Sequence, residues 1–469
     1  MMLPNSAQSC VAARRVLTET FAQADALILY RQVLTSPIML QLRQAIAASD
    51  PSATGSAYAE FLHTLAEFRP LSFLDGSCWQ RYLASVVLCD QNNFTTACAR
   101  HEDTSAYRAL LEHDLRIINA LYNMDFSALE ADLAALEAGL SALEASLSAP
   151  VAASSLPDPP LPVISSIPPH SCGPNPLDDS PYRRELAAAL AGGEPWTRQV
   201  DLLTRFHQHN GAGMCVRFAA LRWQPAACGY LAGVETPDPV RLDNLAEYKA
   251  EREAIIDNTE RFLSGLPACN VLLYGDKGTG KSATVKALLW EYARRGLRIV
   301  ELERSRLADV SIVLETLRYL GGKFILFADD LSFDEGDSSY KDLKAVLEGS
   351  LTARPANVVM YVTSNRRHLV TEKIADRQPS FSDDAEFRWQ DALQEKLSVA
   401  DRFGLTVIFA SPDQESYVRI AAHLAKQAGI DVEFAELRAK AIRWALWRNG
   451  QTPRSAQQFV DDLKAEITG

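Results

Sequence analysis

The segment of this chain that most constrains its fold lies between residues 271 and 296. Val271-Leu-Leu-Tyr274 is an apolar run that predicts a buried strand, and the residues from Ala283 to Gly296 predict a helix. The turn between them reads Gly275-x-x-x-x-Gly280-Lys281-Ser282, which is the spacing of a phosphate-binding loop. Strand, loop and helix follow one another in the order that such a loop requires, so we expect a site for a phosphate chain here.

Phosphate binding at this loop has a direct physical basis. Glycines let backbone N–H groups converge on a phosphate chain, and the following helix adds its free N-terminal donors and positive dipole end. Lys281 is expected to reach the β- and γ-phosphates, and the hydroxyl of Ser282 is expected to ligate Mg²⁺. The residues of this segment that we expect to bind the nucleotide are Gly275, Asp276, Lys277, Gly278, Thr279, Gly280, Lys281, Ser282 and Ala283.

Composition narrows the class of protein. The 469 residues suffice for two or three domains, and a net charge of -12 argues against nonspecific binding to nucleic acid or anionic membranes. The eight cysteines form no C-x-x-C pair, which disfavours a zinc ribbon or a disulfide framework and favours reduced thiols. We find no signal-peptide pattern and no apolar stretch near the ~20 residues of a membrane helix. We therefore expect a cytoplasmic protein that does not enter the membrane.

The chain divides by composition into five segments. Residues 1–149 are rich in Ala and Leu at helical spacing, which predicts an all-α N-terminal domain whose role the sequence does not indicate. Residues 150–181 form a proline-rich linker, because proline removes backbone donors and favours extended chain. Residues 182–269 predict a helical lead-in, residues 270–411 a nucleotide-binding subdomain, and residues 412–469 a helical lid.

A leucine-rich seam ends the N-terminal segment. Its apolar residues alternate spacings of three and four over about three heptads, as in a coiled coil. The seam consists of Phe126, Leu129, Leu133, Leu136, Leu140, Leu143 and Leu147. It fits either an intermolecular coiled coil or a last helix packed on its own bundle, and its shortness favours the second interpretation.

The lead-in is expected to end in a helix that runs up to the phosphate loop. Tyr182–Gly193 and Trp196–His209 predict two helices, and Gly211–Asp243 predicts a loop-rich passage. Leu242–Leu266 predicts one long amphipathic helix. Such a lead-in commonly carries the residues that flank a bound adenine, but the pattern does not single them out.

From the phosphate loop onward, short apolar runs alternate with helical segments. This alternation predicts a parallel sheet covered by helices on both faces. The expected strands are Val271–Tyr274, Leu297–Leu302, Phe324–Ala328, Val358–Thr363 and Leu405–Phe409. Ligands on such sheets bind at the carboxyl ends of the strands, so the residues that follow each strand are candidates for the site.

Polar side chains follow two of these strands. Asp329 is placed to hold Mg²⁺ opposite Ser282, and Asp330 to polarise the attacking water. Asn365 is expected to contact the γ-phosphate or to align that water. In isolation Asn365 would be an ordinary turn residue, and its place after a phosphate loop favours the catalytic interpretation.

Two arginines are candidates for contacts with the nucleotide. Arg402 precedes the last strand, where it is placed to reach the nucleotide of a neighbouring subunit and to stabilise the transition state of phosphoryl transfer. The alternative is a structural ion pair with an acid such as Asp401. Arg454 stands at the start of the last lid helix, which Thr452 caps and Pro453 begins. We expect Arg454 to sense the nucleotide, the alternative being an ordinary surface arginine.

These motifs, in this order, resemble those of the AAA+ ATPases. Over about residues 180–469 the chain resembles more closely a bacterial family catalogued as domain of unknown function 815, whose members are known as predicted ATP-binding proteins without an assigned substrate. The segments that carry the resemblance are Gly275-Asp-Lys-Gly-Thr-Gly-Lys-Ser282, Asp329-Asp-Leu-Ser-Phe-Asp-Glu-Gly-Asp337, Leu343-Lys-Ala-Val-Leu-Glu-Gly349, Thr363-Ser-Asn-Arg-Arg-His-Leu369 and Asp401-Arg-Phe-Gly-Leu405.

The resemblance implies both a fold and a set of ligands. The fold would be α/β: a P-loop AAA+ core with a parallel five-stranded sheet, helices on both of its faces and a C-terminal helical lid, beside the all-α N-terminal domain. The ligands would be ATP and Mg²⁺, and the assembly a homo-oligomer such as a hexameric ring. Asp330 departs from the family pattern, because many AAA+ proteins carry Glu there. Since Asp is one methylene shorter, water activation is expected to be slower or to recruit another group, for which Glu335 is a weaker candidate.

Three functions remain open from the sequence. The first is an ATPase that hydrolyses ATP at subunit interfaces to remodel or load a protein partner, which the N-terminal domain would recruit. The second is an ATP-gated oligomeric scaffold or switch with negligible turnover. The third is an ATPase that acts on nucleic acid, like a replication initiator or helicase loader. The third rests on the paired aspartates alone, and the acidic charge balance opposes it.

Overall fold

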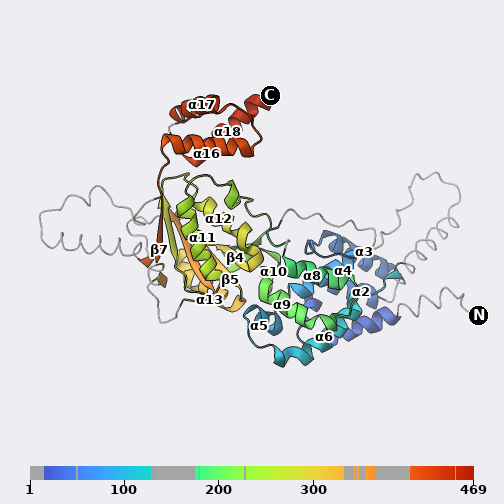
Figure 1. The fold of residues 1–469 in the computed structure, drawn as a ribbon. Helices are drawn as coiled ribbons and strands as arrows, with labels where there is room; N and C mark the ends of the chain where they lie inside the picture. Colours follow the sequence, from blue (N-terminus) through green and yellow to red (C-terminus); the bar gives the residue numbers. More distant parts are fainter. Residues whose placement is uncertain are drawn as a thin grey trace, which may run out of the picture. The chain divides into compact units, whose positions relative to one another are not determined.

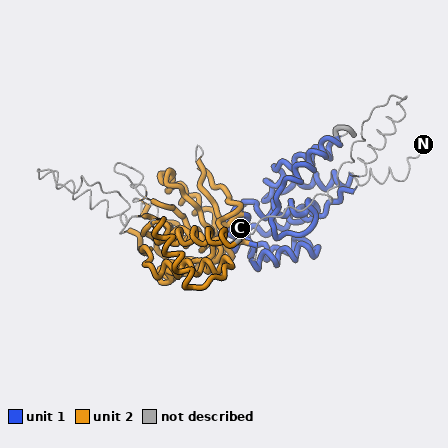
Figure 2. The backbone as a smooth tube through the Cα atoms, turned by 90° about the horizontal axis from the view of Figure 1, so that it is seen from above, with its two compact units in different colours: residues 1–174, 178–217 blue, residues 175–177, 218–469 orange. Residues whose placement is uncertain are grey.

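The computed structural model describes residues 15–48, 51–127, 130, 175–178, 180–225, 229–331, 343, 346–347, 354–365, 402–448 and 450–468. The chain forms two compact units (Figure 2), one of residues 1–174 and 178–217 and the other of residues 175–177 and 218–469. Most of the leucine-rich seam, the linker over 150–174 and Glu335 lie outside the described residues.

The described part of the first unit consists of helices. Its α-helices are α2 (Pro37–Ala47), α3 (Pro51–Glu67), α4 (Cys78–Leu88), α5 (Asn93–Ala99), α6 (Arg108–Tyr122), α8 (Pro181–Ala191), α9 (Val200–Asn210) and α10 (Met214–Arg217). Short 3-10 helices are η1 (Ala24–Ala26), η2 (Arg31–Thr35), η3 (Ser105–Tyr107) and η5 (Trp196–Gln199). The helices expected at residues 182–193 and 196–209 are confirmed, and the second of them begins as a 3-10 turn.

Buried polar contacts tie these helices together. The indole nitrogen of Trp79 in α4 donates to the carbonyl of Leu121 in α6 at 2.8 Å. The buried carboxylate of Asp114 accepts the backbone N–H groups of residues 28–30, which satisfies three donors of an irregular segment. Because helices α8 to α10 belong to this unit, the expected lead-in 182–269 is divided between the two units after Arg217.

A seven-stranded sheet forms the centre of the second unit (Figure 1), with strand order β2-β1-β4-β5-β6-β3-β7. The strands are β1 (Ala220–Gln224), β2 (Tyr230–Val234), β3 (Val271–Gly275), β4 (Leu297–Glu301), β5 (Lys323–Ala328), β6 (Val358–Ser364) and β7 (Leu405–Phe409). The five expected strands are therefore confirmed to within one residue at each end. They run parallel to one another, and β3, which leads into the phosphate loop, lies between β6 and β7.

The sheet differs from the expected one at its β2 edge. The passage 211–243, expected to be loop-rich, contains the hairpin of β1 and β2, so the sheet is mixed and has seven strands rather than five parallel ones. Strand β1 pairs in parallel with β4 and antiparallel with β2. Residues of β1 alternate between buried and half-buried, as in a strand that covers the core with one face. Five residues of such alternation are too few to distinguish a strand from a loop by sequence.

The long helix expected over 242–266 is confirmed over Lys249–Leu263, and its expected start is wrong. Residues 238–248, which we call the strap, contain the 3-10 turn η6 (Leu242–Asn244). Helix α11 (Lys249–Leu263) begins only after the strap. The strap ends in Glu247 and Tyr248, whose φ angles of 56° and 51° lie in the left-handed region. Contacts with other elements hold this conformation: Tyr248 donates its hydroxyl to the carbonyl of Ala410 at 2.7 Å, and Glu247 pairs with Arg419 at 2.7 Å.

The remaining helices cover the sheet or form the lid. Those near the sheet are α12 (Lys281–Tyr292), η7 (Ala293–Arg295), η8 (Arg304–Asp309) and α13 (Val310–Leu320), and α11, α12 and α13 contact its strands. The lid helices, drawn in red in Figure 1, are α16 (Gln414–Gln427), α17 (Phe434–Trp447) and α18 (Pro453–Thr468). They share an apolar core of their own. The expected cap of α18 is confirmed, because the N–H of Ser455 donates to the hydroxyl of Thr452 at 3.2 Å.

No described helix is long and apolar enough to span a lipid bilayer.

Candidate nucleotide site

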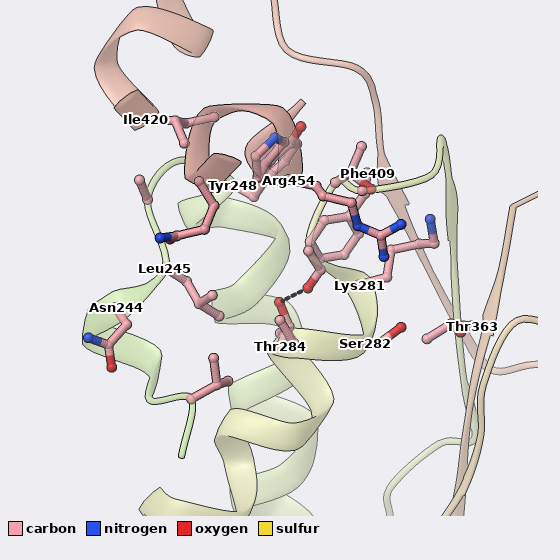
Figure 3. Close-up of a pocket in the computed structure, with 18 of the residues that line it drawn as sticks. Asn244, Leu245, Tyr248, Lys281, Ser282, Thr284, Thr363, Phe409, Ile420 and Arg454 are labelled. Atoms are coloured by element: carbon pink, nitrogen blue, oxygen red, sulfur yellow. Dashed lines mark hydrogen bonds between the residues drawn. The ribbon is translucent and has the colours of Figure 1, made fainter. Parts of the chain in front are cut away.

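A cavity of about 660 Å³ lies at the carboxyl ends of β3, β5 and β6, between the strap 238–248 and the lid helices. This volume is in the range of small-molecule and cofactor sites. Figure 3 shows the side chains that line it. Most of the expected site residues are among them: Lys277, Gly278, Thr279, Gly280, Lys281, Ser282, Ala283, Asp329, Asp330, Asn365 and Arg454.

The end of β3 is packed so tightly that only glycine fits at position 275. A Cβ on Gly275 would lie 1.9 Å from the carbonyl oxygen of Phe409 in β7. Gly275 also has a φ of 148°, and Gly278 and Gly280 have φ of 80° and 94°, which side chains disfavour. Gly275 and Asp276, which are also expected to bind the nucleotide, are not among the residues that line the cavity. Their carbonyl oxygens accept hydrogen bonds from Lys281.

Lys281 is the cation at the centre of the loop. Its side chain is 5% exposed, and Nζ donates to the carbonyls of Gly275 at 2.8 Å and Asp276 at 2.7 Å, and to Oδ1 of Asn365 at 3.2 Å. Burial lowers the pKa of Lys281, while the carboxylates of Asp330, Asp276 and Asp329 act in the opposite direction. An ammonium group held this way is ready to exchange carbonyl partners for phosphate oxygens.

Ser282 and Asp329, the residues expected to bind the metal, contact each other. The hydroxyl of Ser282 donates to Oδ1 of Asp329, and the hydroxyl of Thr363 in β6 donates to the same oxygen. Mg²⁺ in nucleotide sites is bound by one or two carboxylates together with phosphate oxygens and water. One carboxylate and one hydroxyl beside a phosphate loop fit that set. No cluster of three or more His, Cys, Asp or Glu that could hold a metal occurs among the described residues.

Asp330 and Asn365 face each other across the ends of β5 and β6. Nδ2 of Asn365 donates to Oδ1 of Asp330, while Oδ1 of Asn365 accepts from Lys281. Asp330 has a φ of 51°, and its N–H donates to the hydroxyl of Thr363 at 2.8 Å. A non-glycine residue in the left-handed region is strained, and such strain often occurs at functional positions. The lysine, amide and carboxylate thus form one continuous hydrogen-bonded chain.

Arg454 enters the cavity from the lid. Its backbone N–H donates to the carbonyl of Gly278 at 3.2 Å, and a Cβ on Gly278 would lie 3.1 Å from Cβ of Arg454. Figure 3 shows the Arg454 side chain directed toward the side of the cavity where Lys281 lies, with Asn244 and Leu245 on the other side. The start of α18 therefore rests directly on the phosphate loop.

Arg402 does not line the cavity of its own chain. It is exposed and precedes β7, so it lies near the amino end of that strand. The phosphate loop follows the carboxyl end of β3, which runs parallel to β7. Arg402 and the phosphate loop thus lie at opposite ends of these parallel strands.

The wall opposite the phosphate loop was not identified from the sequence. It consists of side chains from the strap, from α11 and from the lid, and it includes Pro239, Val240, Asn244, Leu245, Ala246, Tyr248, Arg252, Ile420, Leu424 and Gln427. Tyr248 also packs on Phe409 with ring centroids 5.2 Å apart. The position of the lead-in pointed to this region, but its mostly apolar residues carry no motif.

Comparison with known proteins places the second unit in a family. The model of the family described as "Protein of unknown function (DUF815)" matches residues 216–467. No curated protein matches the chain. Solved structures of RuvB from Thermotoga maritima are similar to part of it: the Holliday junction branch migration motor at 15% identity and a TM-score of 0.34, and a point variant of RuvB at 15% and 0.35. In both, the match covers 49% of this chain and 66% of the RuvB chain, so it spans somewhat less than two thirds of RuvB.

Proposed function

Since the chain belongs to the DUF815 family and folds as an AAA+ nucleotide-binding core with a helical lid, we propose that it binds ATP together with Mg²⁺ and hydrolyses it. One observation carries the proposal. Lys281, Asn365 and Asp330 form a hydrogen-bonded chain beside the Ser282 and Asp329 pair, at the carboxyl ends of three parallel strands. Groups that would bind phosphate, hold a metal and act on water therefore meet in one cavity.

Each group has a separate task in this mechanism. The backbone N–H groups of the loop and the ammonium of Lys281 bind the β- and γ-phosphates, as charge-assisted hydrogen bonds do. Ser282 and Asp329 are the residues that would hold Mg²⁺, which neutralises negative charge on the phosphates when it is bound. Arg454 joins the phosphate side of the cavity to the lid, so lid position and nucleotide occupancy are coupled. The mostly apolar wall of strap and lid takes the base.

Asp330 is the group proposed to polarise the attacking water. Asn365 donates to its carboxylate, which fixes the direction of that carboxylate relative to Lys281. A general base must lie within hydrogen-bond reach of the water that it activates. Because aspartate is shorter than glutamate, we propose slow turnover.

Arg402 is proposed to act in trans on the nucleotide of a neighbouring copy. The support is its exposed position at the amino end of β7, whereas the chain's own phosphate loop follows the carboxyl end of the parallel strand β3. A cation supplied by a neighbour stabilises the charge that develops in phosphoryl transfer. ATP hydrolysis would then require a homo-oligomer and would be used to remodel or load a protein partner recruited through the first unit.

A specific observation also favours the second candidate, an ATP-gated scaffold with negligible turnover. The carboxylate of Asp330 accepts from Asn365, so a water competes with an amide for the same oxygen. In this case ATP would order the assembly without being consumed.

Replacing Asp330 by asparagine separates these functions. Asp330→Asn keeps the size of the side chain and removes its charge, so the Kd for ATP should change by less than about twofold while phosphate release falls about 100-fold. Asp257→Asn, at an exposed position of α11, is the matched control and should behave as the wild type. Undiminished turnover in Asp330→Asn would remove Asp330 from the mechanism. ATP binding without phosphate release by the wild type at any protein concentration would favour the scaffold.

A further inference from the structure

The segment that carries Arg402 rests on one short loop, residues 268–270. The N–H of Leu405, the first residue of β7, donates to the carbonyl of Asn270 at 3.2 Å. At Gly404, an added Cβ would lie 2.7 Å from Sγ and 2.9 Å from Cβ of Cys269. The loop 268–270 therefore occupies the space that a side chain at position 404 would need, and it sets where residues 402–404 lie.

Arg354 braces that loop from outside. It lies four residues before β6, on an exposed turn, and its guanidinium makes two hydrogen bonds to the loop. Nη1 donates to Oδ1 of Asn270 at 3.0 Å, and Nη2 donates to the carbonyl of Ala268 at 2.9 Å. The two donors thus span the loop from residue 268 to residue 270.

Two further contacts make the loop a junction between strands. Oδ1 of Asn270 also accepts the backbone N–H of Met360 in β6 at 3.0 Å, so both of its partners are donors. On the inner side, the amide of Asn258 in α11 clasps Cys269, accepting its N–H at 2.9 Å and donating to its carbonyl at 3.0 Å. Arg354 is exposed, and its removal leaves the hydrogen bonds between the buried side chain of Asn258 and Cys269 intact.

We propose that Arg354 is a positioning residue for the trans-acting arginine: it holds loop 268–270, and through Asn270 and Cys269 it fixes the segment that presents Arg402 to a neighbouring subunit. This inference rests on the proposed function of Arg402. It adds a second arginine, which acts on the neighbour's reaction through Arg402 without touching the nucleotide. Nη1 and Nη2 of Arg354 both donate to the loop of its own chain, which supports a role in positioning rather than direct contact with the neighbour's nucleotide.

The geometry requires arginine at this position. Two acceptors two residues apart match the planar fork of a guanidinium, whereas the single ammonium of lysine satisfies one of them at a time. Misplacement of a catalytic group by about 1 Å can cost on the order of 100-fold in rate. Loss of the two hydrogen bonds from Arg354 should therefore lower kcat and leave ATP affinity unchanged, because the cavity lies at the opposite end of the parallel strands.

The test measures ATP hydrolysis by full-length Arg354→Ala, Arg354→Lys and Arg295→Ala. Arg295→Ala is the matched control, since Arg295 is an exposed arginine that faces Glu260 at 3.6 Å and does not contact the loop. We expect kcat to fall at least about tenfold in Arg354→Ala and less in Arg354→Lys, with the Kd for ATP, the oligomeric state and the thermal midpoint kept. Arg295→Ala should match the wild type.

Mixed oligomers supply the readout that a general structural role would not move. Arg354→Ala keeps a working pocket and lacks a well-placed Arg402. Lys281→Ala keeps a well-placed Arg402 and lacks a working pocket. Mixing these two impaired proteins should restore turnover well above the sum of the separate rates. A mixture that stays at that sum, or an Arg354→Ala protein with wild-type kcat, would overturn the role of Arg354. If Arg402→Ala itself turns over normally, the proposed trans mechanism fails first, and the role of Arg354 fails with it.

Discussion

At the scale of single residues, Lys281 is a buried cation whose hydrogen-bond partners and neighbouring carboxylates suit the binding of an anion. As a residue, Lys281 is almost fully buried, and burial alone would favour the neutral amine. The carbonyls of Gly275 and Asp276 and the amide of Asn365 hold it, and three nearby carboxylates offset the cost of its charge. A phosphate chain would bring a stronger partner for the same charge.

Removing this ammonium should abolish tight nucleotide binding. Lys281→Ala deletes charge-assisted hydrogen bonds worth about 3 kcal/mol, so the Kd for ATP should rise by about 100-fold or more. Titration calorimetry with ATP and Mg²⁺ measures this. Lys440→Ala is the control, because Lys440 lies on lid helix α17, pairs with Glu436 at 3.0 Å and is not among the residues that line the cavity. An unchanged Kd in Lys281→Ala would mean that the nucleotide binds elsewhere.

At the scale of elements, the strands were predicted almost to the residue, and the walls of the pocket were not. Strands β3 to β7 are short, continuous apolar runs because they are buried in a parallel sheet, and their carboxyl ends are marked by Asp329 and Asn365. The wall opposite the phosphate loop is made of residues such as Leu245 and Ile420, whose residue types occur in any core. Their shared position arises from the lid packing over the strap, which no local pattern encodes.

The same limit explains why the strands β1 and β2 and the start of helix α11 were not predicted. The strands β1 and β2 are five residues each and form a hairpin, which joins the sheet only through the pairing of β1 with β4, a strand distant in the chain. Helix α11 begins late because Glu247 and Tyr248 are held in left-handed conformations by Arg419 and Ala410. Tertiary contacts override helix propensity there.

The contact between Gly404 and Cys269 predicts a paired substitution effect. Gly404→Ala places a methyl group 2.7 Å from Sγ of Cys269, so the segment carrying Arg402 must shift. We expect kcat for ATP to fall about tenfold or more, with the Kd unchanged. Cys269→Gly in the same chain removes the opposing atoms and should restore most of the activity. If the double variant is no better than Gly404→Ala, steric displacement is not the cause.

Helix α9 of the first unit predicts a pH dependence of stability. Burial lowers the pKa of His207 to about 4, and its Nδ1 lies 3.0 Å from the carbonyl of Gly211. In the unfolded chain a histidine has a pKa of about 6.5, so between these values the unfolded state binds the extra proton. Stability should therefore fall as the pH drops from about 6.5 toward 4, and should gain nothing from His207 above that range.

A variant isolates this contribution. His207→Leu removes the titrating group, so the thermal midpoint of the first unit should depend less on pH between 7 and 5 than in the wild type, whatever its absolute value. Differential scanning calorimetry at several pH values gives the two slopes. Equal slopes would show that His207 does not titrate in this range in either state.

At the scale of the whole molecule, the chain passes more than once between the two units. Residues 175–177 belong to the second unit, whereas residues 178–217 return to the first. Leu177 is fully buried in the core of the second unit, together with residues such as Ile255 and Val271. The boundary that composition suggested at residue 182 would therefore cut through the first unit and remove Leu177 from the second.

The buried position of Leu177 predicts a loss of stability in one unit only. Leu177→Ala should lower the free energy of unfolding of the second unit by about 2 to 5 kcal/mol, because it leaves a cavity in the core. The transition of that unit is the one that ATP and Mg²⁺ shift to higher temperature in a thermal scan. Leu266→Ala, at a 57% exposed position, is the control and should leave the transition unchanged. An unaffected transition in Leu177→Ala would show that the contact is dispensable.

The central claim is that ATP is bound in this pocket and hydrolysed with the help of a neighbouring copy. The most direct test is steady-state phosphate release as a function of protein concentration, for the wild type and for Arg402→Ala. We predict that specific activity rises with concentration in the wild type and that Arg402→Ala binds ATP normally without turning it over. Specific activity independent of concentration, with full activity in Arg402→Ala, would contradict the shared active site.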